Sequence, residues 1–344
     1  MQLLRFLLVK HGRPVLRSFY ACLQFCGLIL CSACSQQGLI HGNSGEPARQ
    51  AREFQFRDGG SAIYFSFDKF NGSENRRAAI ASYLFVISGS DCRSMQDYLP
   101  QYFRGLDGES GPLRIFILHK RHIQAGTALQ QGRACSDDFI RADYPSRWLQ
   151  DQGEFLQYWL AQAVQQGQTP QRVVIMGISE GAEIAPLLAL RTPQATHLVL
   201  LANGGMQPLD GLRLLADKTG DAGMLQELAR LDAAFAGPAP VDPDAVASRI
   251  NGRSWRYWSQ LRELRHTENL LALSLPIFIG MGDADTALPV ESASYIRQRF
   301  AAAGKDNLSV HIYPDADHGL RSESRFYLPD FMHQLDLWLQ ITRP

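Results

Sequence analysis

The chain has 344 residues, 45% of them hydrophobic, and its 34 basic residues balance its 34 acidic ones. This composition is ordinary for a globular protein, and the length allows one large domain with a sizeable core. No basic stripe interleaved with aromatic residues is present, so we expect no nucleic-acid partner. The sequence also has no Cys/His cluster with zinc spacing and no glycine-rich phosphate loop, so we expect neither a metal nor another cofactor.

Residues 1–33 have the layout of an export signal. They carry basic but no acidic residues, and the apolar stretch at 18–33 is too short for an ordinary membrane span. The junction "LCSAC" resembles a bacterial lipoprotein signal, which implies cleavage before Cys34 and a lipid on its sulfur. We therefore expect export, with the protein in the periplasm or anchored to the outer membrane through an N-terminal lipid. A soluble exported protein and an uncleaved membrane anchor are the alternatives.

The folded domain is expected to begin after a tether. Residues 34–50 are polar and contain glycine and proline, which is typical of a flexible linker. The segments "EFQFRDG" and "SAIYFSFDKF" then predict a hairpin-like pair of strands, and "SYLFVIS" (82–88) and "LRIFILHK" (113–120) predict core strands. The α/β-type domain is predicted to occupy 51–344.

Two cysteines, Cys92 and Cys135, belong to this predicted domain. Three others would leave with the signal, and Cys34 would be lipidated. A pair of cysteines in an exported domain suggests a disulfide. Each follows a core strand, so in a parallel sheet both loops would emerge at the same edge. Two unrelated buried thiols are the alternative.

The segment "GISEG" (177–181) is the most informative motif. It follows the apolar run "RVVIM" (172–176), which predicts a buried strand, and precedes "AEIAPLLAL" (182–190), which predicts an apolar helix. Strand, Gly-x-Ser-x-Gly and helix together define a nucleophile elbow, in which a sharp turn exposes the serine Oγ above the sheet. Ser179 is therefore the candidate nucleophile.

A long insertion at about 203–266 follows the next predicted strand, "HLVLLA". Leucines recur at helical spacing around 225–231, prolines break the run, and a second helical pattern covers 254–264. We interpret this insertion as a helical cap over Ser179. Its aromatic residues Trp255, Tyr257 and Trp258 either line a substrate pocket or pack the cap onto the main domain.

The last third of the chain supplies a base and an acid for the serine. "LPIFIGMGDADTALP" (275–289) predicts a strand that runs into an acidic turn, and "LSVHIYPDADHGL" (308–320) predicts a strand followed by a loop with His318. A serine hydroxyl needs a base to take its proton, and the base needs an orienting partner. The candidates are His318 and Asp285, with Asp283 as the alternative acid.

From about Tyr83 to its C-terminus, the chain resembles the α/β-hydrolase family. "GISEG" matches the family's elbow, "GDADTALP" is similar to its Gly-x-x-Asp-x-x-Val-Pro, and "DADHGL" is similar to its histidine loop. This register favours Asp285 over Asp283. The resemblance implies an α/β-hydrolase fold with a mostly parallel central sheet covered by helices. The "SEG" form resembles a branch that holds esterases, acyl-transfer enzymes and some oligopeptidase relatives.

An oxyanion hole needs two backbone N–H donors. In this family one comes from the residue after the nucleophile, here Glu180. The other is expected from the loop that follows 82–88, where we favour Ser90, with Gly89 or Asp91 as neighbours. This loop lacks the His-Gly-Gly-Gly form of some lipases.

Two further histidines, His119 and His122, end an earlier strand near the expected active-site edge and could contact substrate. The sequence as a whole predicts an exported serine hydrolase that cleaves carboxyl esters of a small-molecule acyl substrate. A peptidase or amidase acting on short peptides is the first alternative. A non-catalytic binding protein that retains the fold is the second.

Overall fold

The computed structural model describes residues 47–72, 79–126 and 135–342. The predicted signal and Cys34 lie outside the described residues. An eight-stranded sheet forms the centre, in the order β1-β2-β4-β3-β5-β6-β7-β8. Its strands are β1 (Arg52–Gln55), β2 (Ser61–Lys69), β3 (Ser82–Ile87), β4 (Leu113–Leu118), β5 (Arg172–Ile178), β6 (His197–Leu201), β7 (Ile277–Gly282) and β8 (Leu308–Tyr313).

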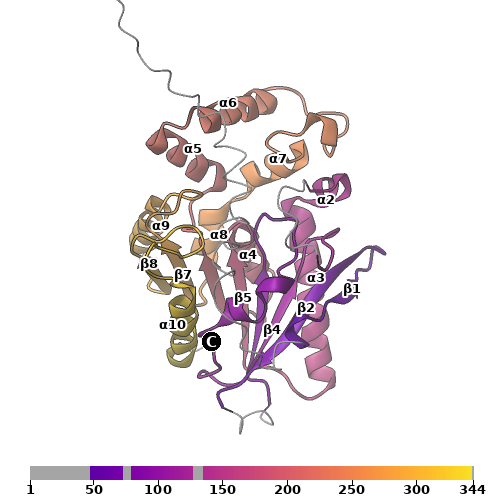
Figure 1. Cartoon of the computed structure of the whole chain (residues 1–344), viewed down its shortest axis with the longest axis vertical. Coiled ribbons are helices and arrows are strands. Elements are labelled where there is room, and N and C mark those ends of the chain that lie inside the picture. The colour runs from indigo at the N-terminus through magenta and orange to yellow at the C-terminus, as the bar shows by residue number, and fades with distance from the viewer. Residues whose placement is uncertain (1–46, 73–78, 127–134, 343–344) are drawn as a thin grey trace, which may run out of the picture.

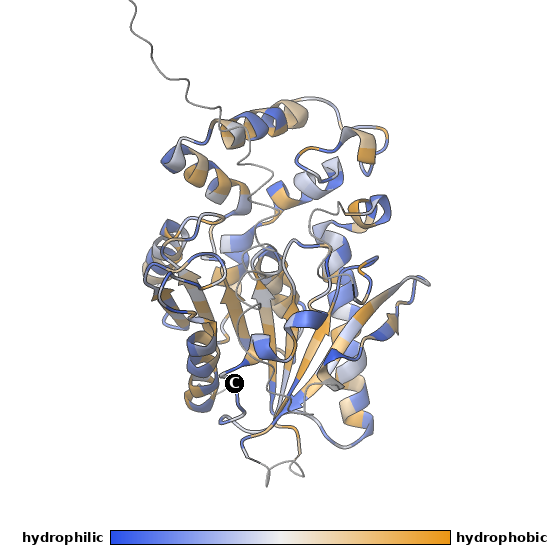
Figure 2. Cartoon of the chain, viewed as in Figure 1, coloured by the Kyte–Doolittle hydropathy of each residue, from blue (hydrophilic) through white to orange (hydrophobic). Residues whose placement is uncertain are grey.

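Antiparallel pairing occurs only at the β1 end of this sheet. β1 pairs with β2 and β2 with β4 in antiparallel register, whereas every pair from β4 across to β8 is parallel. The inner parallel strands β3, β5, β6 and β7 are buried along nearly their whole length and mostly apolar, because helices cover both faces, whereas the edge strand β8 is half-buried. Figure 2 shows these strands as the most hydrophobic part of the chain. The predicted α/β-hydrolase sheet is thereby confirmed.

Helices pack on the two faces because successive strand side chains point in opposite directions. Phe85 and Phe116 join one core cluster with α3 (Pro145–Gln165), α4 (Gly181–Leu190), α8 (His266–Ala272) and α9 (Glu291–Ala302). Leu84 and Ile115 join the other cluster, whose main helix is α10 (Leu328–Ile341). The short helix α2 (Asp137–Ala142) begins at Ser136, whose hydroxyl accepts a hydrogen bond from the Phe139 N–H.

The segment between β6 and β7 is helical and lies above the sheet (Figure 1). It contains α5 (Pro208–Thr219), α6 (Ala222–Ala236) and α7 (Trp255–Glu263), which are joined by contacts of α5 with both others. α7 also contacts α3 of the main domain. We call α5–α7 the cap.

The ordered fold begins before residue 51, earlier than the sequence predicts. Pro47–Arg49 forms a 3-10 turn at the end of the expected tether. Ala48 is buried there, and the Arg49 side chain donates a hydrogen bond to the Leu99 carbonyl at 2.7 Å. A burial contact and a long-range hydrogen bond hold these three residues against the domain, so residues 47–49 belong to it and not to the predicted tether.

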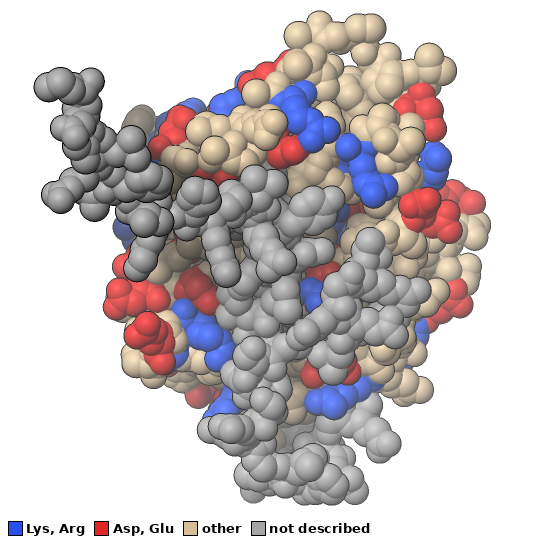
Figure 3. Space-filling model, turned by 45° about the horizontal axis from the view of Figure 1, so that its top comes forward, with Lys and Arg blue, Asp and Glu red and all other residues tan. Residues whose placement is uncertain are grey.

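Basic and acidic side chains are interspersed over the described surface seen in Figure 3. No described helix is both long enough and apolar enough to cross a membrane.

Buried histidines, among them His119 and His197, make the fold sensitive to acid. Burial lowers the pKa of both His119 and His197 from 6.5 to about 4. The unfolded chain therefore takes up these protons at a higher pH than the folded chain does. We expect the contribution of these two histidines to the free energy of unfolding to be largest above pH 6.5 and to fall as the pH drops towards 4. A difference of this size corresponds to about 3 kcal/mol for a fully buried histidine.

Urea unfolding between pH 7 and pH 4.5 measures this effect. A His119→Gln, His197→Gln double variant should lose less stability over this range than the parent chain, whereas His333→Gln, at an exposed position on α10, should follow the parent. Glu183 has the opposite effect, because its raised pKa increases stability as the pH falls from about 8. Since Glu183 is present in the variants and in the parent chain, its contribution cancels in the comparison. Equal pH slopes for the double variant and the parent would contradict the prediction.

Candidate active site

Ser179 lies at the sharp turn between β5 and α4. Its φ of 53° is in the left-handed region, and its N–H donates to the Leu201 carbonyl at 2.8 Å. Glycines on both sides permit the close approach of strand and helix. A Cβ on Gly177 would lie 2.3 Å from the Ala182 Cα, and one on Gly181 would lie 2.3 Å from the Ile87 carbonyl oxygen. Larger residues would not fit, so the Gly-x-Ser-x-Gly spacing follows from packing.

Three side chains from separate loops meet at this turn. The Ser179 Oγ lies 2.8 Å from His318 Nε2, and His318 Nδ1 lies 2.7 Å from Asp285 Oδ2. Asp285 is buried, and its other carboxylate oxygen accepts the N–H groups of Ala287 and Leu288 at 2.7 and 3.0 Å. The two backbone N–H groups therefore hold the carboxylate in the orientation that faces the imidazole. Asp283, the alternative acid, is exposed and away from this chain of hydrogen bonds.

The expected oxyanion donors lie around the serine. Gly89 is so close to Ser179 that a Cβ on it would lie 3.3 Å from the Ser179 Cβ. Ser90 and Glu180 both line the cavity at Ser179, and neither of their N–H groups donates a hydrogen bond within the described residues. These two N–H groups can donate hydrogen bonds to an oxygen that develops negative charge, without breaking an existing bond.

Two cavities meet at Ser179 and His318. The first lies under the cap, with a volume of about 980 Å³ including its opening, and the second lies between the loop after β3 and the histidine loop, with about 1330 Å³. The wall of the first is mainly apolar and includes Leu212, Met224, Leu228, Leu231, Trp258, Leu261 and Leu288. The second also contains polar and charged side chains, among them Asp91, Arg93, Asp317 and Arg321. These two cavities fit a substrate whose carbonyl lies between an apolar group and a more polar group.

Of the three predicted pocket aromatics, Tyr257 and Trp258 line the first cavity and Trp255 does not. The expectation for Trp255 is therefore wrong. At about 100° per residue, positions 257, 258 and 261 share one face of α7, and position 255 points more than 90° away from the centre of that face.

His119 and His122 lie outside both cavities. His119 is buried, and its Nε2 accepts the Met95 N–H at 2.9 Å, which anchors the loop after β3. Neither His119 nor His122 lines either cavity. The possible substrate contacts of these two residues are not supported.

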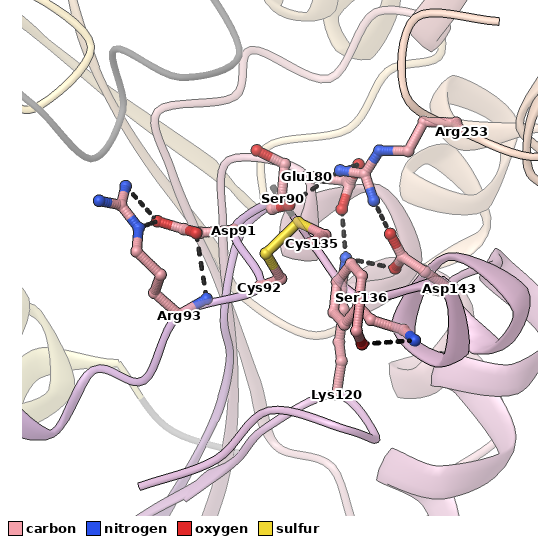
Figure 4. The surroundings of a disulfide bond; sticks show 11 residues. Ser90, Asp91, Cys92, Arg93, Lys120, Cys135, Ser136, Asp143, Glu180 and Arg253 are labelled. Carbon is pink, nitrogen blue, oxygen red and sulfur yellow. Dashed lines mark hydrogen bonds and ion pairs between the residues drawn. A yellow bond between two sulfur atoms is a disulfide. The ribbon is translucent and has the colours of Figure 1, made fainter. Parts of the chain in front are cut away.

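The predicted disulfide joins Cys92 to Cys135, with a Cα–Cα distance of 5.7 Å (Figure 4). Cys92 belongs to the loop that carries Ser90, and Cys135 immediately precedes Ser136, the N-cap of α2. The bridge therefore ties the loop with the proposed oxyanion donor to a helix of the main domain.

Removing this bridge should lower both stability and turnover. It joins residues 43 positions apart, and a loop of this size corresponds to roughly 4 kcal/mol in the chain-entropy model. Oxyanion donors act only when they are already in place, so a Cys92→Ser, Cys135→Ser variant should lose turnover number more than substrate affinity. Steady-state kinetics beside urea unfolding measures both. Unchanged turnover with lowered stability would limit the bridge to a structural role.

Behind the elbow lie four buried charged side chains, Lys120, Asp143, Glu180 and Arg253, which we call the charge cluster (Figure 4). The Lys120 ammonium contacts Asp143 at 2.9 Å and also contacts Glu180. The Arg253 guanidinium contacts Asp143 and lies 3.2 Å from Glu180, and the Tyr257 hydroxyl donates to Glu180 at 2.6 Å. The two cations balance the two carboxylates, as buried ions require.

Burial also changes the protonation of single groups here. It lowers the pKa of Lys120 to about 8, although Glu180 opposes the shift. It raises the pKa of Glu183, whose side chain borders the first cavity, to about 8. Glu183 is therefore mainly neutral at pH 7 and adds little charge to that cavity.

The sequence does not predict the charge cluster, because its members come from four separate places: the loop after β4, the C-terminal end of α2, the elbow and the cap. No described group of His, Cys, Asp or Glu side chains is arranged to hold a metal ion.

Comparison with known proteins agrees with this geometry. Residues 254–333, which include Asp285 and His318, match the Dienelactone hydrolase family. The structure is similar to Est1E from Butyrivibrio proteoclasticus, with a TM-score of 0.54 and 13% identity over 86% of this chain and 99% of that one. It is also similar to the Pyrococcus furiosus esterase Pf2001, with a TM-score of 0.53 and 12% identity over 89% and 97%. No curated protein sequence matches the chain.

A peptidase shares the fold as well. The Mycobacterium tuberculosis puromycin-hydrolyzing peptidase has a TM-score of 0.53 and 12% identity over 87% of this chain, which corresponds to 39% of its own length. The sheet and the elbow are those of an α/β-hydrolase fold, and the Ser–His–Asp contacts have the geometry of a serine-hydrolase site.

Proposed function

We propose that the protein is a carboxylesterase in which Ser179 is the nucleophile. The observation that carries this proposal is the hydrogen-bonded chain Ser179–His318–Asp285, which opens where two cavities meet. His318 takes the Ser179 proton as Oγ attacks the ester carbonyl, then gives it to the leaving alcohol. Water hydrolyses the acyl-enzyme by the same steps in reverse. Asp285 keeps the second imidazole proton on Nδ1 and stabilises the imidazolium.

We assign the stabilisation of the negative charge on the attacked oxygen to the N–H groups of Glu180 and Ser90. Both are available, and Glu180 is the N-cap of α4, where the positive end of the helix dipole adds to the field. Gly89 gives the loop its close approach to the serine.

The two cavities suggest how an ester is held. The cavity under the cap suits the acyl group, since most of its wall consists of leucine, methionine and tryptophan side chains. Of its three acids, Glu183 is mainly neutral, Glu180 is paired within the charge cluster, and Glu227 is paired with Arg230. The second cavity, which contains charged side chains, suits a more polar alcohol. An uncharged acyl chain and a polar leaving group therefore describe the expected substrate.

Peptide or amide cleavage is the second candidate, because a puromycin-hydrolyzing peptidase and an acylaminoacyl peptidase share the fold. A panel of p-nitrophenyl esters of increasing acyl length, beside aminoacyl p-nitroanilides, separates the two. The esterase proposal requires kcat/KM for the best ester to exceed that for every anilide by well over tenfold. Preference for an anilide would reverse the assignment.

We also propose that the protein is exported and anchored by a lipid on Cys34. The support is the layout of residues 1–33 and the "LCSAC" junction. One acyl chain binds a membrane only marginally, so stable anchoring implies more than one. The native protein should partition with membranes and carry lipid mass, and Cys34→Ser should release it or block processing. Soluble protein with an unmodified Cys34 at its N-terminus would exclude lipidation.

A further inference from the structure

Arg253 joins the cap to both sides of the proposed oxyanion hole. It lies in a tight turn just before α7, where Ile250 and Arg253 exchange both backbone hydrogen bonds at 3.0 Å. From this turn its side chain enters the charge cluster and is almost fully buried (Figure 4). One guanidinium nitrogen, Nη2, donates to the Ser90 carbonyl at 2.8 Å and lies 3.2 Å from the Glu180 carboxylate.

The contact with Ser90 is important because little else holds this residue. Within the described part of the chain, the Ser90 main chain makes no other hydrogen bond. Neighbouring anchors act further along the loop, at the Cys92 disulfide and at the Met95 N–H. Arg253 is therefore the polar contact that fixes the loop at the candidate donor itself.

Glu180 differs from Ser90 in this respect. Its backbone lies at the start of α4 and is held by the helix, so this donor has a fixed place. An oxyanion hole requires that the second donor be fixed relative to the first. The guanidinium contacts the residues that carry both donors, and its other nitrogen, Nη1, pairs with Asp143 at the C-terminal end of α2.

We propose that Arg253 is a positioning residue that sets the Ser90 donor relative to Glu180 and so makes a correctly seated cap a condition for catalysis. This inference rests on the proposed function, since it concerns the same oxyanion hole. Arg253 does not line either cavity, so its effect passes through Ser90 and Glu180 and not through contact with substrate.

The geometry demands arginine at this position. A guanidinium is planar and offers donors in several directions, whereas an ammonium is a compact point charge. Arg253→Lys keeps the charge balance of the cluster but cannot hold Ser90, Glu180 and Asp143 together in the same way. This variant separates a positioning role from a purely electrostatic one.

The test compares Arg253→Lys with Arg256→Lys. Arg256 lies three residues away, pairs with Asp244 near the surface and lines neither cavity. For Arg253→Lys we expect kcat on the best ester to fall roughly 10- to 100-fold, somewhat less than the loss of a whole oxyanion donor. KM should stay within about twofold, and phosphonylation of the serine by a fluorophosphonate should slow in parallel with kcat. Arg256→Lys should match the parent chain.

A second variant covers the case in which Arg253→Lys folds poorly. Arg253→Gln with Asp143→Asn leaves one cation and one carboxylate, so the cluster stays neutral while the link to Ser90 is lost. The proposal predicts the same selective loss of kcat. It is overturned if a folded variant keeps kcat within twofold of the parent, or if KM rises while kcat is unchanged. Failure of the parent chain itself on every ester would instead count against the esterase assignment, and the phosphonylation rates would still test Arg253.

Discussion

Replacing Ser179 with alanine is expected to remove nearly all turnover and to leave the fold intact. The Oγ that would attack the carbonyl is lost, and triad members act as a unit, so loss of the nucleophile costs on the order of 10⁶ in kcat. The oxyanion hole and the cavities remain, and a residual acceleration of about 10³ over water would come from them. Ester hydrolysis under saturating substrate measures the loss.

A matched variant guards against an unfolding artefact. Ser179 has a φ of 53°, which glycine adopts without strain. Ser179→Gly should therefore be as inactive as Ser179→Ala and no less stable than the parent in urea unfolding. Substantial turnover in either folded variant would mean that another group is the nucleophile.

Asp285→Asn should give the second largest loss. His318 Nδ1 lies 2.7 Å from Asp285 Oδ2, so the carboxylate holds the imidazole in the tautomer whose Nε2 can accept the Ser179 proton. An amide in that place can favour the wrong tautomer and cannot stabilise the imidazolium. The loss in kcat for the equivalent change in a serine protease is about 10⁴, and we expect a similar value here.

Asp283→Asn is the control, because it changes a nearby exposed acid in the same turn. Its kcat should stay close to that of the parent chain. The kcat values of the two variants, measured over pH 6 to 9, test the assignment. If Asp283→Asn were the inactive variant, the register that selects Asp285 would be wrong.

The sequence predicts those parts of the molecule that local rules determine. The alternating and continuous apolar runs predict the parallel strands. The glycines around Ser179 predict the elbow, because a Cβ on Gly177 or Gly181 would lie only 2.3 Å from a backbone atom. The order of serine, acid and histidine follows from the strands that each residue ends. The Cys92–Cys135 bridge can also be predicted from the sequence, since both loops emerge at one edge of the sheet.

Other parts depend on how distant segments meet, and the sequence contains no local signal for them. Nothing in the sequence around each member distinguishes Lys120, Asp143 and Arg253 from ordinary solvent-exposed charges. Only the packing of the cap onto the main domain buries them together. The sequence also does not predict that Trp255 points away from the cavity. Which face of α7 lies towards the cavity depends on how the helix packs on the rest of the protein. The ordering of Pro47–Arg49 likewise depends on Leu99, a partner fifty residues away.

Covalent labelling with a fluorophosphonate tests most directly that this protein is a serine hydrolase acting through Ser179. The intact native protein would be treated with the probe, digested and analysed by tandem mass spectrometry, with Ser179→Ala and His318→Ala beside it. We predict one adduct, on Ser179, which is absent in Ser179→Ala and forms far more slowly in His318→Ala. An adduct on another residue, or no adduct in folded parent protein, would contradict the assignment.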